Sequence, residues 1–190
     1  MPCMLWGISP FCSLSFSYKF LPSLLFLSCC NLQGSLQPFL RWKNLENSSN
    51  GFKNQPRNVQ IVELQTEKTP LTVVNTHKGL KKLERRSQFS LLHEHLSSRL
   101  KQHKTPLFLA GDFNEWQFFS RAFHALNGLL NQQKIGATFP SHFPVFSLDR
   151  VWVSDDIRVK ACRKLKNAKT RVFSDHLPVL VDIELPECAE

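Results

Sequence analysis

The sequence lacks the patterns that mark several common classes of protein. None of its six cysteines lies in a CxxC pair or at a Cys/His spacing suited to zinc, and a disulfide scaffold is not expected at this length. The apolar stretch 21–27 is far shorter than the roughly 20 residues of a membrane-spanning helix. No Lys or Arg precedes Lys19, and no cleavage site of the A-x-A type follows. These absences predict no stable membrane span and favour the cytoplasm as the location, with export left open.

The sequence has only 7 glycines and 11 prolines among 190 residues, while 42% of the residues are hydrophobic and 21% are charged. This composition excludes a collagen-like repeat, a wholly disordered chain and a polytopic membrane protein. It predicts one domain with a hydrophobic core. The net charge of +9 would attract a polyanion such as nucleic acid or anionic lipid headgroups, although charge alone does not indicate a fold.

The chain divides into two unlike parts. Residues 1–57 show neither helical nor strand periodicity, and 41–57 are polar and turn-rich, which is typical of a linker or exposed loop. An orderly pattern begins near Val59, and we place the bounds of the folded part at residues 58–187. We therefore expect an atypical, irregular N-terminal segment followed by the folded part of the domain.

Short apolar runs and one long amphipathic stretch define the expected elements of this second part. Strands are predicted at 59–64 and 71–75, joined as a hairpin, and at 106–110, 148–153 and 177–185. Helices are predicted at 80–100 and 118–130, the first with an apolar face of Leu80, Leu83, Phe89, Leu92, Leu96 and Leu100. The mixture predicts an α+β fold in which helices are layered on sheets.

Polar side chains follow or begin four of the expected strands. They are Asn75-Thr76-His77, Gly111-Asp112-Phe113-Asn114, Asp149-Arg150 and Ser174-Asp175-His176. Taken singly, each has a simpler interpretation as a turn, an Asx cap, a local ion pair or a strand entry. Together they supply three carboxylates, two amides and two imidazoles. That set suits hydrolysis of a phosphate ester with the help of a hard divalent cation.

In this order, the motifs resemble those of the endonuclease/exonuclease/phosphatase superfamily, whose fold is DNase-I-like. The resemblance covers roughly residues 59–185, and Gly-Asp-Phe-Asn followed by Ser-Asp-His-Leu-Pro is its most specific part. The matching stretches are Val73–Leu80, Glu84–Gln88, Leu109–Asn114, Ala137–Pro140 with Leu148–Ser154, and Ser174–Val179. The resemblance implies a layered α/β sandwich and a metal-dependent phosphodiesterase or nuclease-like hydrolase using Mg²⁺ or Mn²⁺. Its partner would be a phosphodiester, with nucleic acid, lipid and inositol phosphate all open as substrates.

The resemblance also implies roles for six residues. His77 would contact the scissile phosphate or the leaving group, and Asp112 would orient or deprotonate the attacking water. Asn114 would hold the nucleophile or the transition-state oxygens. Asp149 would hydrogen-bond His176 and favour its cationic form. Asp175 would be a metal-site carboxylate.

Two motifs of the family are not recognisable, namely a strand with an active-site Asn and a strand with a metal-binding Glu. Glu63 and Glu67 lie one strand before Asn75-Thr76-His77, which is the wrong place, so neither is assigned as the metal ligand. The pattern predicts about the C-terminal half of the domain, incomplete at its N-terminus. Our hypothesis is a truncated or frame-disrupted member whose hydrolase activity is impaired.

Two other interpretations stay open. The run Lys160–Arg171 carries six cationic side chains and no acidic one, and could bind a nucleic-acid backbone without catalysis. The simpler interpretation of this run is a solvated loop between two strands. The chain could also be a non-functional fragment. Its oligomeric state is not readable from the sequence.

Overall fold

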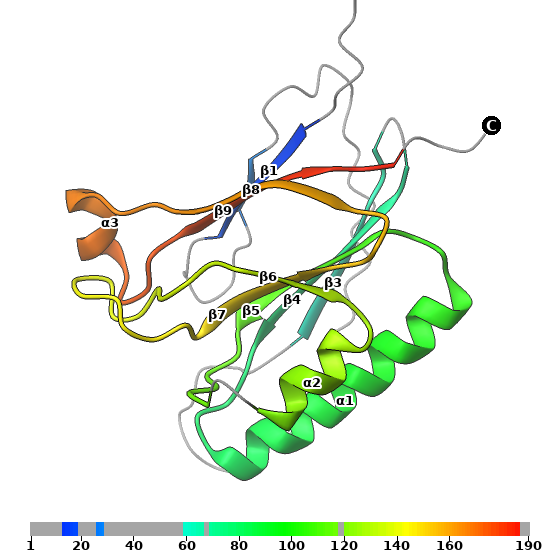
Figure 1. The fold of residues 1–190 in the computed structure, drawn as a ribbon, viewed down its shortest axis with the longest axis horizontal. Helices are drawn as coiled ribbons and strands as arrows, with labels where there is room; N and C mark the ends of the chain where they lie inside the picture. The colour runs from blue at the N-terminus through cyan, green and yellow to red at the C-terminus, as the bar shows by residue number, and fades with distance from the viewer. Residues whose placement is uncertain (1–12, 19–25, 29–58, 67–68, 118–119, 187–190) are drawn as a thin grey trace, which may run out of the picture.

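The computed structural model describes residues 13–18, 26–28, 59–66, 69–117 and 120–186, the first two ranges as backbone only (Figure 1). The strands are β1 Ser13–Tyr18, β2 Phe26–Ser28, β3 Val59–Leu64, β4 Leu71–His77, β5 Leu107–Asp112, β6 Asn131–Gln133, β7 Asp149–Val153, β8 Arg158–Lys164 and β9 Val179–Glu184. The helices are α1 Lys82–Gln102, α2 Arg121–Asn127 and α3 Ala168–Phe173. No helix in these ranges is long and apolar enough to cross a membrane.

The described residues form two sheets and a helical layer. The five-stranded sheet has the order β3-β4-β5-β7-β6, and the four-stranded sheet has the order β2-β1-β9-β8. Strands β3 and β4 pair antiparallel as the predicted hairpin, whereas β4 and β5 are parallel and are connected by α1. Helices α1 and α2 cover one face of the five-stranded sheet, and β8 and β9 lie over the other (Figure 1). The predicted α+β class is confirmed.

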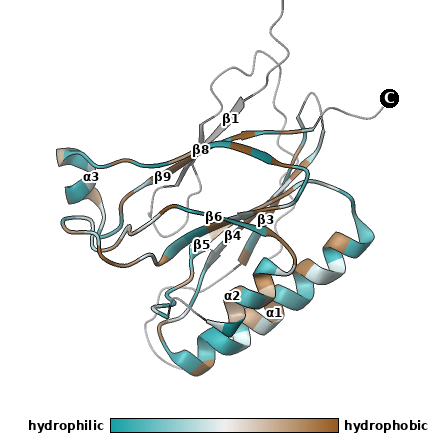
Figure 2. Ribbon diagram, in the orientation of Figure 1, coloured by the Kyte–Doolittle hydropathy of each residue, from teal (hydrophilic) through white to brown (hydrophobic). Residues whose placement is uncertain are grey.

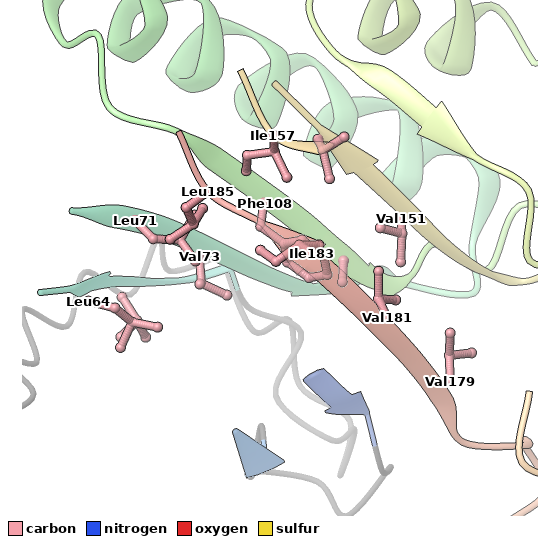
Figure 3. Close-up of a cluster of buried hydrophobic side chains, with 13 residues drawn as sticks. Leu64, Leu71, Val73, Phe108, Val151, Ile157, Val179, Val181, Ile183 and Leu185 are labelled. Atoms are coloured by element: carbon pink, nitrogen blue, oxygen red, sulfur yellow. The ribbon is translucent and has the colours of Figure 1, made fainter. Parts of the chain in front are cut away.

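The five-stranded sheet is buried on both faces, and β5 shows this most clearly. Leu107 and Leu109 pack toward the helices, in a cluster with Leu92 of α1 and Trp152 of β7. Phe108 and Ala110 point the other way, into the cluster between the sheets. That second cluster includes Val73, Val151, Val181 and Ile183, which meet between the strands in Figure 3. A strand that is buried on both faces has a continuous apolar sequence, and for this reason the apolar run at 106–110 predicts β5 directly.

The long helix has a narrower apolar face than predicted. Phe89, Leu92 and Leu96 are buried, but Leu80 and Leu83 are 63% and 81% exposed. Leu80 precedes the helix, and Leu83 lies nine residues from Leu92, about 2.5 turns, so the two point in opposite directions. The prediction for these two leucines was wrong. Helix α2 is also shorter than the predicted 118–130, of which 118 and 119 lie outside the described residues.

Five elements lie where no regular structure was expected, and one of them is β6 of the five-stranded sheet. The cationic run forms the edge strand β8 and the short helix α3, so its interpretation as a loop was wrong. Arg163 of β8 pairs with Asp182 of β9, and Lys160 of β8 pairs with Glu184 of β9. These ion pairs neutralise part of the positive charge that makes the sequence of this run typical of a solvated loop. Strands β1 and β2 lie within residues 1–57, and the backbone of β1 pairs antiparallel with β9.

Candidate active site

Strand register places three of the predicted site residues in one row at one edge of the five-stranded sheet. His77 ends β4, Asp112 ends β5, and Asp149 begins β7. His77 is the register partner of Asp112, which is in turn the register partner of Asp149. The two carboxylates are almost fully buried, at 3% exposure each. The row therefore follows from pairing alone, because neighbouring strands carry opposed residues about 5 Å apart.

His176 reaches this row from the other sheet. It precedes β9, and its Nδ1 lies 2.7 Å from Asp149 Oδ2. Its Nε2 lies 4.0 Å from Asp112 Oδ2, and His77 Nε2 lies 3.5 Å from the same oxygen. The result is a continuous line of charge and hydrogen bonding from Asp149 through His176 and Asp112 to His77.

Three acids near its ring favour the protonated form of His176. Burial lowers the pKa of His176, but the hydrogen bond and charge of Asp149, followed by the charges of Asp112 and Asp175, outweigh burial and raise the pKa above its ordinary value. The contact with Asp149 also fixes Nδ1 as the protonated nitrogen facing inward. Nε2 is left to face Asp112 and the edge of the sheet.

Asn114 lies beside this line, but its side chain braces the loop after His77. Its Nδ2 donates to the Lys78 carbonyl at 2.9 Å, and its backbone N–H donates to Asp112 Oδ1 at 2.9 Å. Asn114 has a φ of 49°, a left-handed conformation that Asn tolerates better than most residues. The Asx turn thereby orients the Asp112 carboxylate while the amide ties β5 to the loop of His77.

Three residues near the site were not assigned a role from the sequence. Thr138 is fully buried and donates its hydroxyl to Asp149 Oδ2, the same oxygen that meets His176. The Phe139 ring lies against His176, with 4.9 Å between ring centroids. Gln88 of α1 accepts from the Gly79 N–H and, through its backbone carbonyl, from Lys78 Nζ. These residues lie within the motif stretches Ala137–Pro140 and Glu84–Gln88, so the resemblance could have predicted that they lie near the site.

Asp175 is the predicted metal carboxylate, and it is exposed next to the line. Its backbone carbonyl accepts from Ser141 N–H at 2.7 Å, and its charge acts on His176. Within the described residues, no group of three or more His, Cys, Asp or Glu side chains is placed to hold a metal ion. Asp149 Oδ2 is committed to His176 and Thr138, and Asp112 faces two imidazoles, which are poor ligands for Mg²⁺. These residues therefore do not by themselves fit a Mg²⁺ site.

The spacing and placement of these motifs agree with a known family. Residues 25–176 match the profile of the endonuclease/exonuclease/phosphatase family. The chain belongs to this family. The match begins upstream of residue 58, the boundary expected from composition, and so includes part of the segment that showed no periodicity.

Relatives in the family include YbhP, an uncharacterized protein of Escherichia coli strain K12. It is 31% identical over 121 residues, which cover 60% of this chain and 46% of YbhP. The YbhP of Shigella flexneri matches to the same extent. The chain thus spans about half the length of the curated relatives that it matches.

Several solved structures share the fold. The mannosyl-6-phosphatase Bt3783 of Bacteroides thetaiotaomicron superposes with a TM-score of 0.63 at 20% identity, over 78% of this chain and 67% of that one. The human nocturnin catalytic domain with bound sulfate gives 0.60 at 19% identity, over 82% and 62%. D. rerio TDP2 with a single-strand DNA product gives 0.56 at 14% identity, over 77% and 68%. These similarities confirm the predicted DNase-I-like fold.

Proposed function

We propose that this protein hydrolyses phosphoesters at the line formed by Asp149, His176, Asp112 and His77. The observation that carries the proposal is that two imidazole Nε2 atoms, of His77 and His176, lie within 4.0 Å of one buried carboxylate oxygen, Asp112 Oδ2. Such a set can accept a proton from water and present positive charge to a phosphate within one small volume. Family membership supports hydrolysis of a phosphoester as the reaction class.

Each group has a part in the proposed reaction. A water oxygen forms a bond to phosphorus while the bond from phosphorus to the ester oxygen breaks. Asp112, coupled to His176, accepts the proton of the water, and the leaving oxygen takes up a proton from the site or from solvent. His77 contacts the phosphate or the leaving group. Asp149 and Thr138 position His176, and Asn114 holds the loop that carries His77.

We propose that the cofactor is a divalent cation, Mg²⁺ or Mn²⁺, and that the Asp175 carboxylate would contact it. A bound cation would neutralise phosphate charge. Because the described residues bring too few oxygen ligands together, we propose that hydrolysis by this chain is slow. None of the roles given above to the protein side chains depends on that ion.

A comparison of point variants tests the proposed reaction. The purified protein is incubated with Mg²⁺ or Mn²⁺ and bis-p-nitrophenyl phosphate, plasmid DNA, an abasic duplex and a sphingolipid. DNA is included because the TDP2 structure holds a DNA product. We expect slow turnover of one ester class that falls at least about a hundredfold in Asp112→Ala and His176→Ala. Glu94→Gln and His124→Ala, which alter exposed residues of α1 and α2, should retain it. Equal turnover in all five proteins would contradict the proposal.

The metal part of the proposal has its own test. Chelation by EDTA should slow turnover, and Asp175→Asn should raise the concentration of Mn²⁺ that gives half-maximal rate by about tenfold or more. Glu94→Gln serves again as the matched loss of an exposed carboxylate. Full turnover in EDTA would remove the cation from the account and leave the roles of Asp112 and His176 standing.

A further inference from the structure

Large apolar side chains are exposed at the end of the molecule that carries His176. Phe143 is 75% exposed in the loop before β7, and Val172 and Phe173 are 77% and 64% exposed on α3. Val145 and Leu165 add 47% and 37% exposure. A group of exposed apolar side chains in one region of a soluble fold indicates an interaction site more often than chance. We refer to these five residues, with Lys166, Lys169 and Arg171, as the α3 surface.

The α3 surface lies directly beside the candidate site. Ser141 joins its two segments, since its hydroxyl donates to the Arg171 carbonyl at 3.1 Å and its N–H donates to the Asp175 carbonyl at 2.7 Å. Phe143 is two residues beyond Ser141, and Phe173 is three residues before His176. Helix α3 and the loop before β7 lie at the same end of the molecule in Figure 1.

A capping box at its N-terminus stabilises helix α3. The Thr170 N–H donates to Asn167 Oδ1 at 2.8 Å, and the Asn167 N–H donates to Thr170 Oγ1 at 2.9 Å. This capping box buries Thr170 and fixes the single turn that carries Val172 and Phe173. The apolar side chains therefore face solvent from an ordered helix, and Figure 2 shows hydrophobic and hydrophilic residues side by side along it.

Cationic side chains are interspersed with the apolar ones. Lys166, Lys169 and Arg171 flank Leu165, Val172 and Phe173, and no acidic residue occurs between Asp156 and Asp175. Within the described part of the chain, the ion pairs of this region involve Arg158, Lys160 and Arg163 with acids of β9, and none joins the three cations of the α3 surface. The charge of this surface is therefore available to an anionic partner.

From these contacts we infer that the α3 surface docks on an anionic lipid bilayer, with Val172, Phe173 and Phe143 entering the interface and the three cations contacting lipid phosphates. The transfer of apolar side chains from water to the acyl region lowers the free energy, and so does the approach of cations to an anionic membrane surface. Nucleic acid would use the same cations and could stack bases on Phe143 and Phe173. The aliphatic side chains of Val145, Leu165 and Val172 have no such use in binding nucleic acid, and they favour the bilayer. Docking at this end would bring lipid headgroup phosphates to the edge of the sheet that carries His77 and Asp112. This last step rests on the proposed function, whereas docking itself does not.

Vesicle sedimentation tests the docking. The full chain is mixed with vesicles of phosphatidylglycerol and phosphatidylcholine, with vesicles of phosphatidylcholine alone, and with single-stranded and duplex oligonucleotides. The variants are Val172→Ser with Phe173→Ser, and Lys166→Gln with Lys169→Gln and Arg171→Gln. Leu83→Ser is the control, because Leu83 is 81% exposed on α1, away from this surface. Circular dichroism checks that each variant is folded.

We expect binding to the anionic vesicles, weaker binding to phosphatidylcholine, and a loss of at least about tenfold in each α3-surface variant. Leu83→Ser should bind as the unaltered chain does. Failure of the unaltered chain to bind anionic vesicles would overturn the inference, as would binding to oligonucleotides alone or an equal loss in Leu83→Ser. Asp112→Ala should bind vesicles normally, so docking without lipid hydrolysis would retain the inference and reject the proposed function.

Discussion

The two buried basic side chains at the site are held toward opposite protonation states. Burial lowers the pKa of Lys78 from 10.5 to about 7, and its Nζ donates to the Gln88 carbonyl rather than to an acid. Burial acts on His176 as well, but the acids around it raise its pKa. The acids therefore favour positive charge on the imidazole, next to Asp112, whereas burial disfavours positive charge on Lys78.

The pKa of His176 should depend chiefly on Asp149. Asp149→Asn keeps an acceptor oxygen but removes the charge, so we expect the pKa of His176 to fall toward or below its ordinary value, since burial is then less opposed. Titration of the ring protons by NMR measures this. Asp155→Asn, in an exposed turn, should leave the titration unchanged. An unchanged pKa in Asp149→Asn would show that the 2.7 Å contact does not hold the proton.

Lys78 should make folding stability rise with pH. Between its folded pKa of about 7 and its unfolded value of 10.5, the unfolded chain holds a proton that the folded chain has released. The free energy of unfolding therefore increases across that interval, and the cost of burying the charge is fully present below it. Lys78→Met should flatten this rise and stabilise the protein near pH 7 by about 2–4 kcal/mol, after the loss of one hydrogen bond.

Urea unfolding between pH 6 and 10 measures this effect. Lys82→Met, an exposed lysine at the start of α1, should keep the slope of the parent protein. A Lys78→Met protein that is less stable at pH 7 would mean that the charged amine is satisfied in the fold.

At the scale of elements, the close approach of β4 and β5 sets the site. A Cβ at Gly111 of β5 would lie 2.0 Å from the Thr76 carbonyl oxygen of β4, so only glycine fits at this position, which is one residue before the pair of His77 and Asp112. Gly111→Ala must move one strand, and we expect a loss of about 3 kcal/mol or more in the free energy of unfolding. Gly128→Ala follows α2, where the nearest atom is 3.4 Å away, and should change stability by less than about 1 kcal/mol. Chemical denaturation of both variants compares the two positions, and equal effects would contradict this packing argument.

The elements that the sequence predicts well are those with a periodic burial pattern of their own. In β9, Val179, Val181 and Ile183 are buried in alternation, and in β5 every residue is buried. Each pattern is local, so the strand can be recognised without knowing its partner. The site residues follow the same logic because they stand where those runs end or begin.

Other elements depend on partners that the sequence does not reveal. Strand β8 is an edge strand whose cations pair with Asp182 and Glu184 of β9, so its own residues read as a solvated loop. Thr138 acquires its role only because the chain brings it to Asp149, eleven residues later. Leu83 illustrates the opposite error, since an apolar residue near the right spacing faces solvent.

At the scale of the whole molecule, the site depends on the packing of one sheet against the other. The five-stranded sheet supplies His77, Asp112 and Asp149, and the entry to β9 supplies His176. The cluster between the sheets, with Val73, Val181 and Ile183, therefore determines the 4.0 Å distance from His176 Nε2 to Asp112 Oδ2. A substitution that loosens this cluster should therefore also change the geometry of the site.

In the proposed reaction His77 and His176, which are remote in sequence, face one phosphate. Titration of the folded protein with inorganic phosphate, followed by the ring resonances of its histidines, tests this most directly. We expect the resonances of His77 and His176 to shift together with a single dissociation constant, while those of His124, on the exposed side of α2, do not shift. Shifts in only one of the two rings, or midpoints that differ between them, would contradict it.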